Sequence, residues 1–196
     1  MPDREKPWIG FPLSDEIYRE VGLFIAHWAY FQSEFDEFLD GMLMLPEAMA
    51  LVKKAVPSQY NKRANLLRDA AFVCFPSCPS LTEKIGKIVE DAESVKVYRD
   101  LVAHGRWAIG PNQIVSVHSL KKSGKSLHKD ITVELLFDHS IKTSALSRRL
   151  MSIKRGGHIF NDHSFPLSQD EIKAVGDFLL RSRPKLPTPN IAVHHR

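Results

Sequence analysis

An apolar stripe with helical spacing, from residue 17 to residue 42, constrains the fold of this chain more than any other feature. It consists of Ile17, Val21, Phe24, Ile25, Trp28, Phe31, Phe35, Phe38, Leu39 and Met42. Such spacing places large side chains on one helix face, where they pack against a core. Ser14 precedes Asp15 and Glu16, which is typical of a helix start because the hydroxyl accepts first-turn amides and the acids meet the positive helix end. We therefore expect a long core helix that begins at Ser14.

Further helices are expected along most of the chain. The spacing of apolar residues and the turn residues predict helices at about 46–56, 58–73, 80–104, 142–154 and 168–181. Ser80 with Glu83, and Ser168 with Glu171, have the form of a capping box, in which the two side chains bind first-turn amides reciprocally. These two positions are therefore expected to start helices.

One part of the chain has a different pattern. Residues 113–120 and 130–137 are β-branched and partly alternating, and Gly124 lies between them at an expected turn. We interpret the region at about 113–137 as a β-hairpin insert. The predicted fold class is mostly α, a bundle of about four core helices with an inserted β-hairpin.

The length and composition indicate one soluble domain over residues 1–196. With 196 residues, 43% hydrophobic and 26% charged, the chain is ordinary for a globular protein with a sizeable core. Residues 1–13 are expected to form an extended arm packed by Trp8 and Phe11, and residues 183–196 a flexible tail that contains three prolines. No apolar run approaches the roughly 18 residues of a membrane span, and the first residues lack a signal-peptide core. We expect a cytoplasmic protein without a membrane partner.

The net charge permits a nucleic-acid partner without requiring one. It is +4 at pH 7. Two short basic clusters contribute to it, and they consist of Lys121, Lys122, Lys125 and Lys129, and of Arg148, Arg149, Lys154 and Arg155. Such clusters form solvated faces more often than binding grooves.

Cysteine and histidine spacing does not predict a metal site. Cys74 and Cys78 lie in a proline-rich connection and are expected to be reduced thiols, with a disulfide or half a metal site as alternatives. His158 with His163, and the adjacent histidines 194–195, lack the spacing of a zinc-binding set. We therefore expect no metal cofactor.

A guanidinium, a carboxylate and an imidazole lie within six residues near the end of the helix expected at 80–104. The apolar stripe of that helix consists of Leu81, Ile85, Ile88, Ala92, Val95 and Val102. Arg99 lies on this stripe, and a half-buried cation there needs a carboxylate, a phosphate or a partner chain. His104 precedes Gly105, the usual residue at a helix end. An arginine that holds phosphate and a histidine that exchanges protons near neutral pH suit phosphodiester chemistry.

Arg99, the adjacent polar Asp100 and His104 after Leu101 to Ala103 resemble the signature of the HEPN superfamily. Members of that family are helical bundles and often RNases, with the motif near the end of a late bundle helix. The resemblance implies that Arg99 and His104 are catalytic and that Asp100 orients or tunes them. It also implies a homodimer in which two motifs face one cleft, and cleavage of RNA without a metal or other cofactor. A toxin with an antitoxin partner, or a phage-defence component, is the implied role.

The same residues allow a second interpretation. In a non-catalytic HEPN-like dimer that binds nucleotide, RNA or a partner protein, Arg99 and Asp100 form a structural ion pair and His104 caps the helix carbonyls. The acidic residues of the first helix, Glu34, Asp36 and Glu37, either include a partner for Arg99 or lie on a solvated surface.

Overall fold

The computed structural model describes residues 13–109, 114–120, 126–156 and 165–182. The elements are α1 (Asp15–Leu43), α2 (Pro46–Met49), α3 (Tyr60–Cys74), α4 (Pro79–His104), β1 (Arg106–Ile109), β2 (Val115–Leu120), β3 (Ser126–Asp130), α5 (Val133–Lys154) and α6 (Gln169–Ser182). Most of the described residues are helical, and the strands form a small antiparallel sheet in the order β1-β2-β3. The predicted mostly α class is confirmed.

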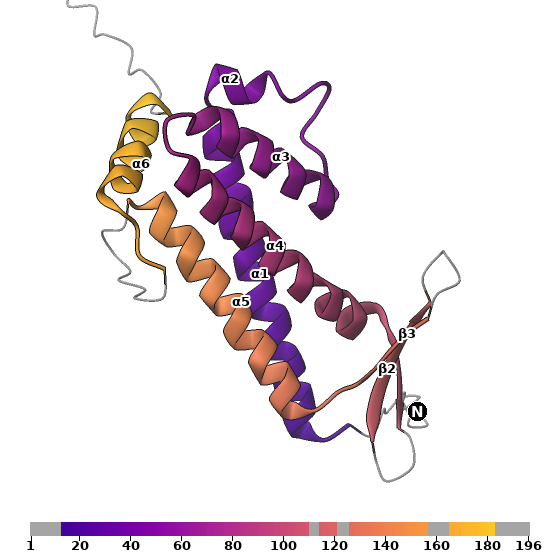
Figure 1. Cartoon of the computed structure of the whole chain (residues 1–196). Helices are drawn as coiled ribbons and strands as arrows, with labels where there is room; N and C mark the ends of the chain where they lie inside the picture. Colours follow the sequence, from indigo (N-terminus) through magenta and orange to yellow (C-terminus); the bar gives the residue numbers. More distant parts are fainter. Residues whose placement is uncertain (1–12, 110–113, 121–125, 157–164, 183–196) are drawn as a thin grey trace, which may run out of the picture.

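The helices form an elongated bundle with the sheet at one end (Figure 1). Helix α1 packs most extensively against α5, and α4 contacts both α3 and α5. Helices α2 and α3 lie at the end opposite the sheet, while α4 runs toward the sheet and ends beside it (Figure 1). Within the described ranges, no helix combines the length and the apolar character that crossing a membrane requires.

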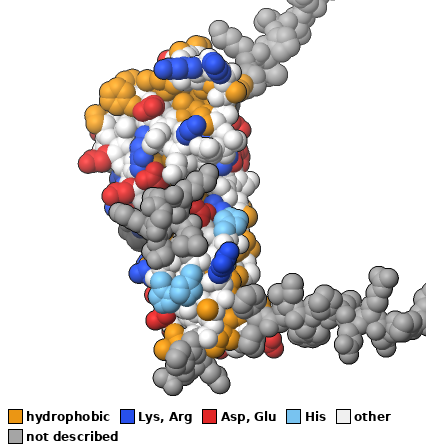
Figure 2. All heavy atoms as spheres, turned by 90° about the vertical axis from the view of Figure 1, so that its right-hand side faces the viewer, with side chains coloured by type: hydrophobic (Ala, Val, Ile, Leu, Met, Phe, Trp, Pro, Cys, Tyr) orange, Lys and Arg blue, Asp and Glu red, His pale blue; other side chains and the backbone are white. Residues whose placement is uncertain are grey.

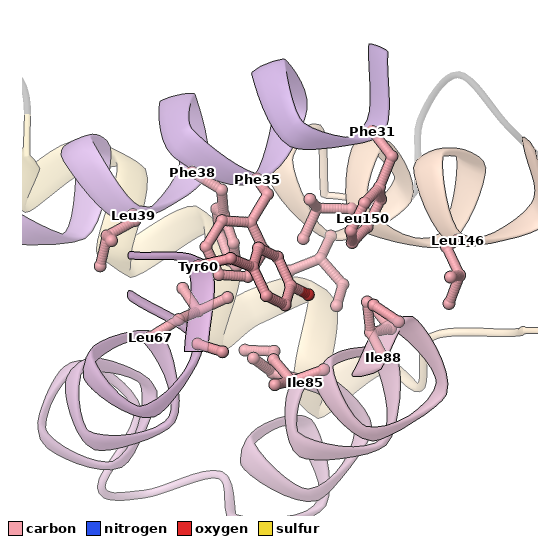
Figure 3. Packing of buried hydrophobic residues seen from close by; sticks show 14 of the residues in the cluster. Phe31, Phe35, Phe38, Leu39, Tyr60, Leu67, Ile85, Ile88, Leu146 and Leu150 are labelled. Atoms are coloured by element: carbon pink, nitrogen blue, oxygen red, sulfur yellow. The ribbon is translucent and has the colours of Figure 1, made fainter. Parts of the chain in front are cut away.

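The aromatic stripe of α1 forms the centre of the core, as predicted. Phe24, Phe31 and Phe35 are fully buried, and Trp28 is nearly so. Figure 3 shows side chains of α1 meeting those of α3, α4 and α5, among them Tyr60, Leu67, Ile85, Ile88, Leu146 and Leu150. The Tyr60 ring lies 5.5 Å from that of Trp28 and 5.4 Å from that of Phe35, between ring centroids. These contacts hold the first turn of α3 against α1.

Two of the three predicted helix starts are confirmed. The Ser14 hydroxyl accepts a hydrogen bond from the Ile17 amide at 3.3 Å. At α6 the Ser168 amide donates to the Glu171 carboxylate at 2.7 Å, and the Glu171 amide donates to the Ser168 hydroxyl at 3.3 Å, which is a capping box.

The capping box predicted at Ser80 is wrong. Helix α4 begins one residue earlier, at Pro79, and its N-cap Cys78 makes no side-chain capping bond. Proline is favoured in the first turn because it has no amide hydrogen to satisfy and its φ angle is already helical. Ser80 lies inside the helix and hydrogen-bonds instead to the side chain of Glu171 on α6.

The hairpin expected at about 113–137 is only half right. Strand β2 covers most of the first predicted strand, but β2 pairs with β3 at 126–130 and also with β1, which the sequence pattern did not indicate. The second predicted strand, 130–137, is wrong because α5 starts at Val133. The Thr132 hydroxyl caps this helix by accepting from the Leu135 amide at 3.1 Å.

The remaining helix bounds differ from expectation by more than two residues at two places. The helix predicted at 46–56 ends at Met49, and the one predicted at 142–154 starts nine positions earlier, at Val133. The N-terminal arm with Trp8 and Phe11 and the tail at 183–196 lie outside the described residues, as do most of the first basic cluster and the histidines at 158, 163, 194 and 195.

The two cysteines are free thiols, as expected from the sequence, and both are buried. Burial, and then the neighbouring carboxylate of Glu47, raises the pKa of the Cys74 thiol to about 11. This thiol is therefore protonated near neutral pH and is a poor nucleophile.

The carboxylate of Glu171 is buried and links α6 to α4. Lys84 Nζ donates a hydrogen bond to it at 2.7 Å, in addition to the bond from the Ser168 amide. Burial by itself raises the pKa of this carboxyl, but the hydrogen bonds from Lys84, Ser168 and Ser80 outweigh burial. The pKa of Glu171 therefore lies below its ordinary value of 4.5.

We expect Glu171→Gln to lower the free energy of unfolding by about 1–2 kcal/mol at neutral pH, because the charge-assisted hydrogen bonds are lost. Since the folded-state pKa lies below the unfolded one, the carboxylate stabilises the protein above its ordinary pKa and stops doing so as the pH falls through the folded value. Urea unfolding of both proteins at pH 7 and at about pH 3 measures this. The stability difference should shrink at the lower pH, and an equal difference at both pH values would contradict the assignment.

Candidate functional site

The last turns of α4 carry the predicted motif, and Gly105 ends the helix beside the sheet. The Gly105 amide donates to the Leu101 carbonyl at 2.7 Å. A Cβ at Gly105 would lie 2.2 Å from Val117 Cγ1 and 2.3 Å from the Leu101 oxygen. Glycine is therefore required here because β2 crosses closely over the end of α4.

Arg99 is half-buried and has two kinds of partner. Its Nη1 lies 3.0 Å from the Asp100 Oδ1, and the guanidinium carbon lies 5.2 Å from the centroid of the Trp28 ring. Its Nε is buried and has no hydrogen-bond partner among the described residues. Of the three partners expected for this cation, a carboxylate, a phosphate or a partner chain, the structure shows a carboxylate, that of Asp100, and the aromatic face of Trp28 adds a cation–π contact.

Asp100 joins two cations on the same helix. Its second oxygen pairs with Lys96 Nζ, one turn earlier, while its first oxygen pairs with Arg99. Asp100 thereby limits the orientations of the Lys96 and Arg99 side chains.

A hollow of about 480 Å³ lies where α3 begins, beside the last turns of α4. Its lining consists of Gln32, Ser58, Gln59, Tyr60, Asn61, Arg63, Lys96 and Arg99. Arg63 contributes a third cation and pairs with Asp36 of α1 at 2.5 Å between Nη1 and Oδ2. The volume falls within the range of about 300–1,000 Å³ that is typical of ligand pockets.

The hollow is suited to an anion. Three cations lie on its lining, and two carboxylates, Asp36 and Asp100, offset part of their charge. The N-cap of α3, Gln59, makes no side-chain capping bond, and the first turn of this helix contains no acid. First-turn amides and the positive end of a helix dipole favour phosphate or carboxylate groups.

His104 lies outside this hollow. It is exposed, and it is the last residue of α4. At about 100° per residue, the side chains of Arg99 and His104 leave the helix about 140° apart, with Asp100 between them and about 40° from His104. The hydrogen bond that ends the helix comes from the Gly105 amide and not from the imidazole. The structure pairs Arg99 with Asp100, whereas His104, one turn after Asp100, has no hydrogen bond or ion pair with either residue.

The acidic residues of α1 do not contact Arg99. Glu34 and Glu37 pair with Lys154 of α5 at 2.8 and 2.7 Å, and Asp36 pairs with Arg63. None of the three acids is paired with Arg99. Glu37 lies on the solvated surface, with its side chain 69% exposed, whereas the Glu34 side chain is only 13% exposed.

Ion pairs also occupy part of the second basic cluster. Lys154 meets the two glutamates of α1, and Arg149 pairs with Asp91 of α4 at 3.2 Å. These two cations join helices of the bundle.

The sequence analysis did not identify Lys96 and Arg63 as members of this site. Lys96 could have been found, because it is three positions before Arg99 and residues three positions apart are neighbours on the surface of a helix. Arg63 lies on a different helix, and the sequence around it gives no signal of its proximity to Arg99.

The sequence analysis also missed a group of histidines. Figure 2, which views the side of the molecule with α3 and the sheet, shows histidine side chains at two places in its lower half, with a Lys or Arg side chain between them.

Comparisons with known proteins identified no relative. No family model matches the chain, and no curated protein or solved structure matches it either.

Within the described ranges, no three His, Cys, Asp or Glu side chains gather in a way that could hold a metal ion.

Proposed function

We propose that this protein is a metal-independent endoribonuclease of the HEPN type, in which Arg99 and His104 are catalytic and Asp100 positions Arg99. The observation that carries the proposal is the hollow in which Arg99 lies beside Lys96, Arg63 and the start of α3. An RNA phosphate is an anion that these groups would bind. The resemblance of the motif to the HEPN signature supports the reaction type.

In the proposed reaction, the ribose 2′-oxygen forms a bond to phosphorus while the bond from phosphorus to the 5′-oxygen breaks. His104 takes the proton of the 2′-hydroxyl or donates a proton to the departing 5′-oxygen. Arg99 offsets the negative charge that grows on the phosphate oxygens. The products carry a 2′,3′-cyclic phosphate and a 5′-hydroxyl.

The angle between Arg99 and His104 supports a homodimer. Because the two side chains leave α4 about 140° apart, a phosphate held by Arg99 would meet His104 more readily if a second copy supplied the histidine. A dimer with two motifs facing one cleft would provide this. We propose a cytoplasmic toxin or phage-defence protein, with an antitoxin protein as a further partner, as the role of such an enzyme.

A non-catalytic dimer that binds RNA, nucleotide or a partner protein is the second candidate. The ion pair between Arg99 and Asp100 and the absence of His104 from the hollow favour it. In this case the hollow binds a phosphate group without cleaving it.

The test is incubation of 5′-end-labelled RNA with the purified protein in excess chelator. We expect cleavage. Phosphatase should not remove the phosphate at the 3′ end of the upstream product until acid has opened the cyclic phosphate. Arg148→Ala serves as a matched control, because Arg148 is an exposed residue of α5 outside the hollow. This variant should cleave RNA as well as the unsubstituted protein does. RNA that is bound but stays whole across several sequences would contradict the ribonuclease and favour the second candidate.

A further inference from the structure

Exposed large apolar side chains gather where α1 and α5 run side by side (Figure 1). Four of them are at least 42% exposed, and they are Leu23 and Tyr30 of α1 and Phe137 and Ile141 of α5. The two helices meet at this level, because His27 Nδ1 lies 3.2 Å from the Ser140 carbonyl oxygen. The residues from α1 lie about one turn before and after His27, and those from α5 flank Ser140. The four side chains therefore form one apolar patch.

The part of α1 that carries this patch has no exposed charge. Between Arg19 and Glu34, the only Asp, Glu, Lys or Arg is Glu20, which is buried. The exposed residues of this stretch are Gly22, Leu23, Ala26, Ala29, Tyr30 and Ser33. We call these six residues, together with Phe137 and Ile141, the α1–α5 face. Single exposed apolar residues are common, but a contiguous uncharged patch marks an interaction site.

Gly22 indicates that another helix packs closely on the α1–α5 face. Glycine inside a helix is less stable than alanine, because its backbone loses more freedom on folding. A Cβ at Gly22 would meet no atom of the described chain within 4 Å, so internal packing does not require glycine there. Gly22, Ala26, Ala29 and Ser33 follow one another at intervals of four, three and four, so they lie on one side of α1. Such small side chains let a second helix approach closely.

The charges at the two ends of this stretch favour a second copy of the chain in antiparallel orientation. Arg19 and Glu37 are about five helical turns apart, so they leave α1 in the same direction. In the single chain Arg19 pairs with Glu20 and Glu37 with Lys154, yet the Arg19 and Glu37 side chains remain 66% and 69% exposed. With a two-fold axis beside Trp28, midway between them, Arg19 of each copy faces Glu37 of the other. A parallel arrangement would place like charges together.

We propose that the α1–α5 face binds a second copy of this chain, with the two α1 helices antiparallel about a two-fold axis beside Trp28. The small residues of α1 form the centre of the contact, and the large apolar side chains of both helices lose their exposure to water around it. Because the contact has two-fold symmetry, every attraction in it occurs twice.

The same pairing places the two cationic hollows on one side of the dimer. Gln32 lines the hollow and leaves α1 about 100° from Ser33, so the hollow lies along one edge of the α1–α5 face. A two-fold axis perpendicular to two antiparallel helices keeps this edge on the same side in both copies. Two motifs that face one cleft would need such an arrangement. This consequence rests on the proposed function, whereas the pairing itself does not.

Sedimentation equilibrium of the full-length protein tests the pairing. We expect the unsubstituted protein to have the mass of a dimer and Ala26→Glu to halve that mass, because each copy would bury a carboxylate without a partner in the contact. Phe72→Glu is the matched control, since Phe72 is an exposed apolar residue of α3 outside the α1–α5 face. This variant should keep the mass of the unsubstituted protein. Circular dichroism confirms that each variant is folded.

An exchange of charges tests the antiparallel orientation. Arg19→Glu should weaken the association about tenfold or more, because acids then face each other at both ends of the contact. Addition of Glu37→Arg to this variant should restore the association, and failure to restore it would overturn the antiparallel arrangement. The proposal is also overturned when the unsubstituted protein is a monomer, or when Ala26→Glu keeps its full mass. A dimer that responds as expected but cleaves no RNA would contradict the ribonuclease and leave the pairing in place.

Discussion

Replacement of His104 by Ala is expected to reduce metal-independent RNA cleavage by about 10²- to 10⁴-fold, which is the usual contribution of a positioned acid or base. The fold should be unaffected, because His104 is exposed at the end of α4 and surface substitutions change stability by about 0.5 kcal/mol or less. RNA binding should also persist, since His104 does not line the cationic hollow. The measurement is single-turnover cleavage of end-labelled RNA in chelator, with binding followed separately.

Variants of the hollow separate catalysis from binding. Arg63→Ala should weaken RNA binding while the bound RNA is still cleaved, whereas Arg99→Ala should impair both, because Arg99 is proposed to contact the reacting phosphate. Full activity of His104→Ala would overturn the catalytic assignment. Loss of binding in the two arginine variants, with no cleavage by any protein, would identify an anion-binding module.

Replacement of Trp28 by Ala is expected to lower the free energy of unfolding by about 3–5 kcal/mol. Trp28 is 2% exposed, and its ring packs against Phe31 and Tyr60 and lies under the guanidinium of Arg99. Its removal leaves a large cavity where α1, α3 and α4 meet. Urea unfolding of both proteins measures the change, with the same dependence of the unfolding free energy on urea concentration fitted to both curves.

Trp28→Phe is the matched control. It keeps an aromatic ring and removes an indole nitrogen that is buried without a hydrogen-bond partner, so its cost should be about 1 kcal/mol. In an Arg99→Ala background, the cost of Trp28→Ala should fall by about 0.5–2 kcal/mol, the value of the cation–π contact. Additive costs would show that the contact of Arg99 with Trp28 does not stabilise the protein.

Two errors in the predicted fold, the strand at 130–137 and the late start of the helix at 142–154, have a common cause in α5. Its buried face mixes apolar residues such as Leu136 and Leu146 with polar ones, and the polar ones in its first two thirds are His139, Ser140, Thr143 and Ser147. Thr143 donates to the His139 carbonyl at 2.7 Å, and Ser147 donates to the Thr143 carbonyl at 3.2 Å, so these hydroxyls are satisfied within the helix. A search for apolar spacing therefore missed the first half of α5, and the β-branched residues near Val133 favoured a strand.

For α1 and α6, in contrast, residues close together in the chain were sufficient to predict where the helix starts. Ser14 and Ser168 satisfy amides within three residues of themselves, so their role follows from their neighbours in the chain. Ser80 has the same pattern around it, but Pro79 starts the helix and Glu171, from a distant helix, binds its hydroxyl. Local patterns fail where a distant partner competes for the same side chain.

The amino-acid sequence by itself determined the mostly α class, the core face of α1 and the closeness of Arg99 to Asp100, because adjacent residues and helical spacing depend on local geometry alone. Tertiary structure decided which charges meet. It brought Arg63 from α3 beside Arg99, paired the acids of α1 with Lys154 and Arg63, and set His118 against His128 across two strands. These contacts depend on how separate helices and strands pack, and the packing follows from burial of apolar surface over the whole chain.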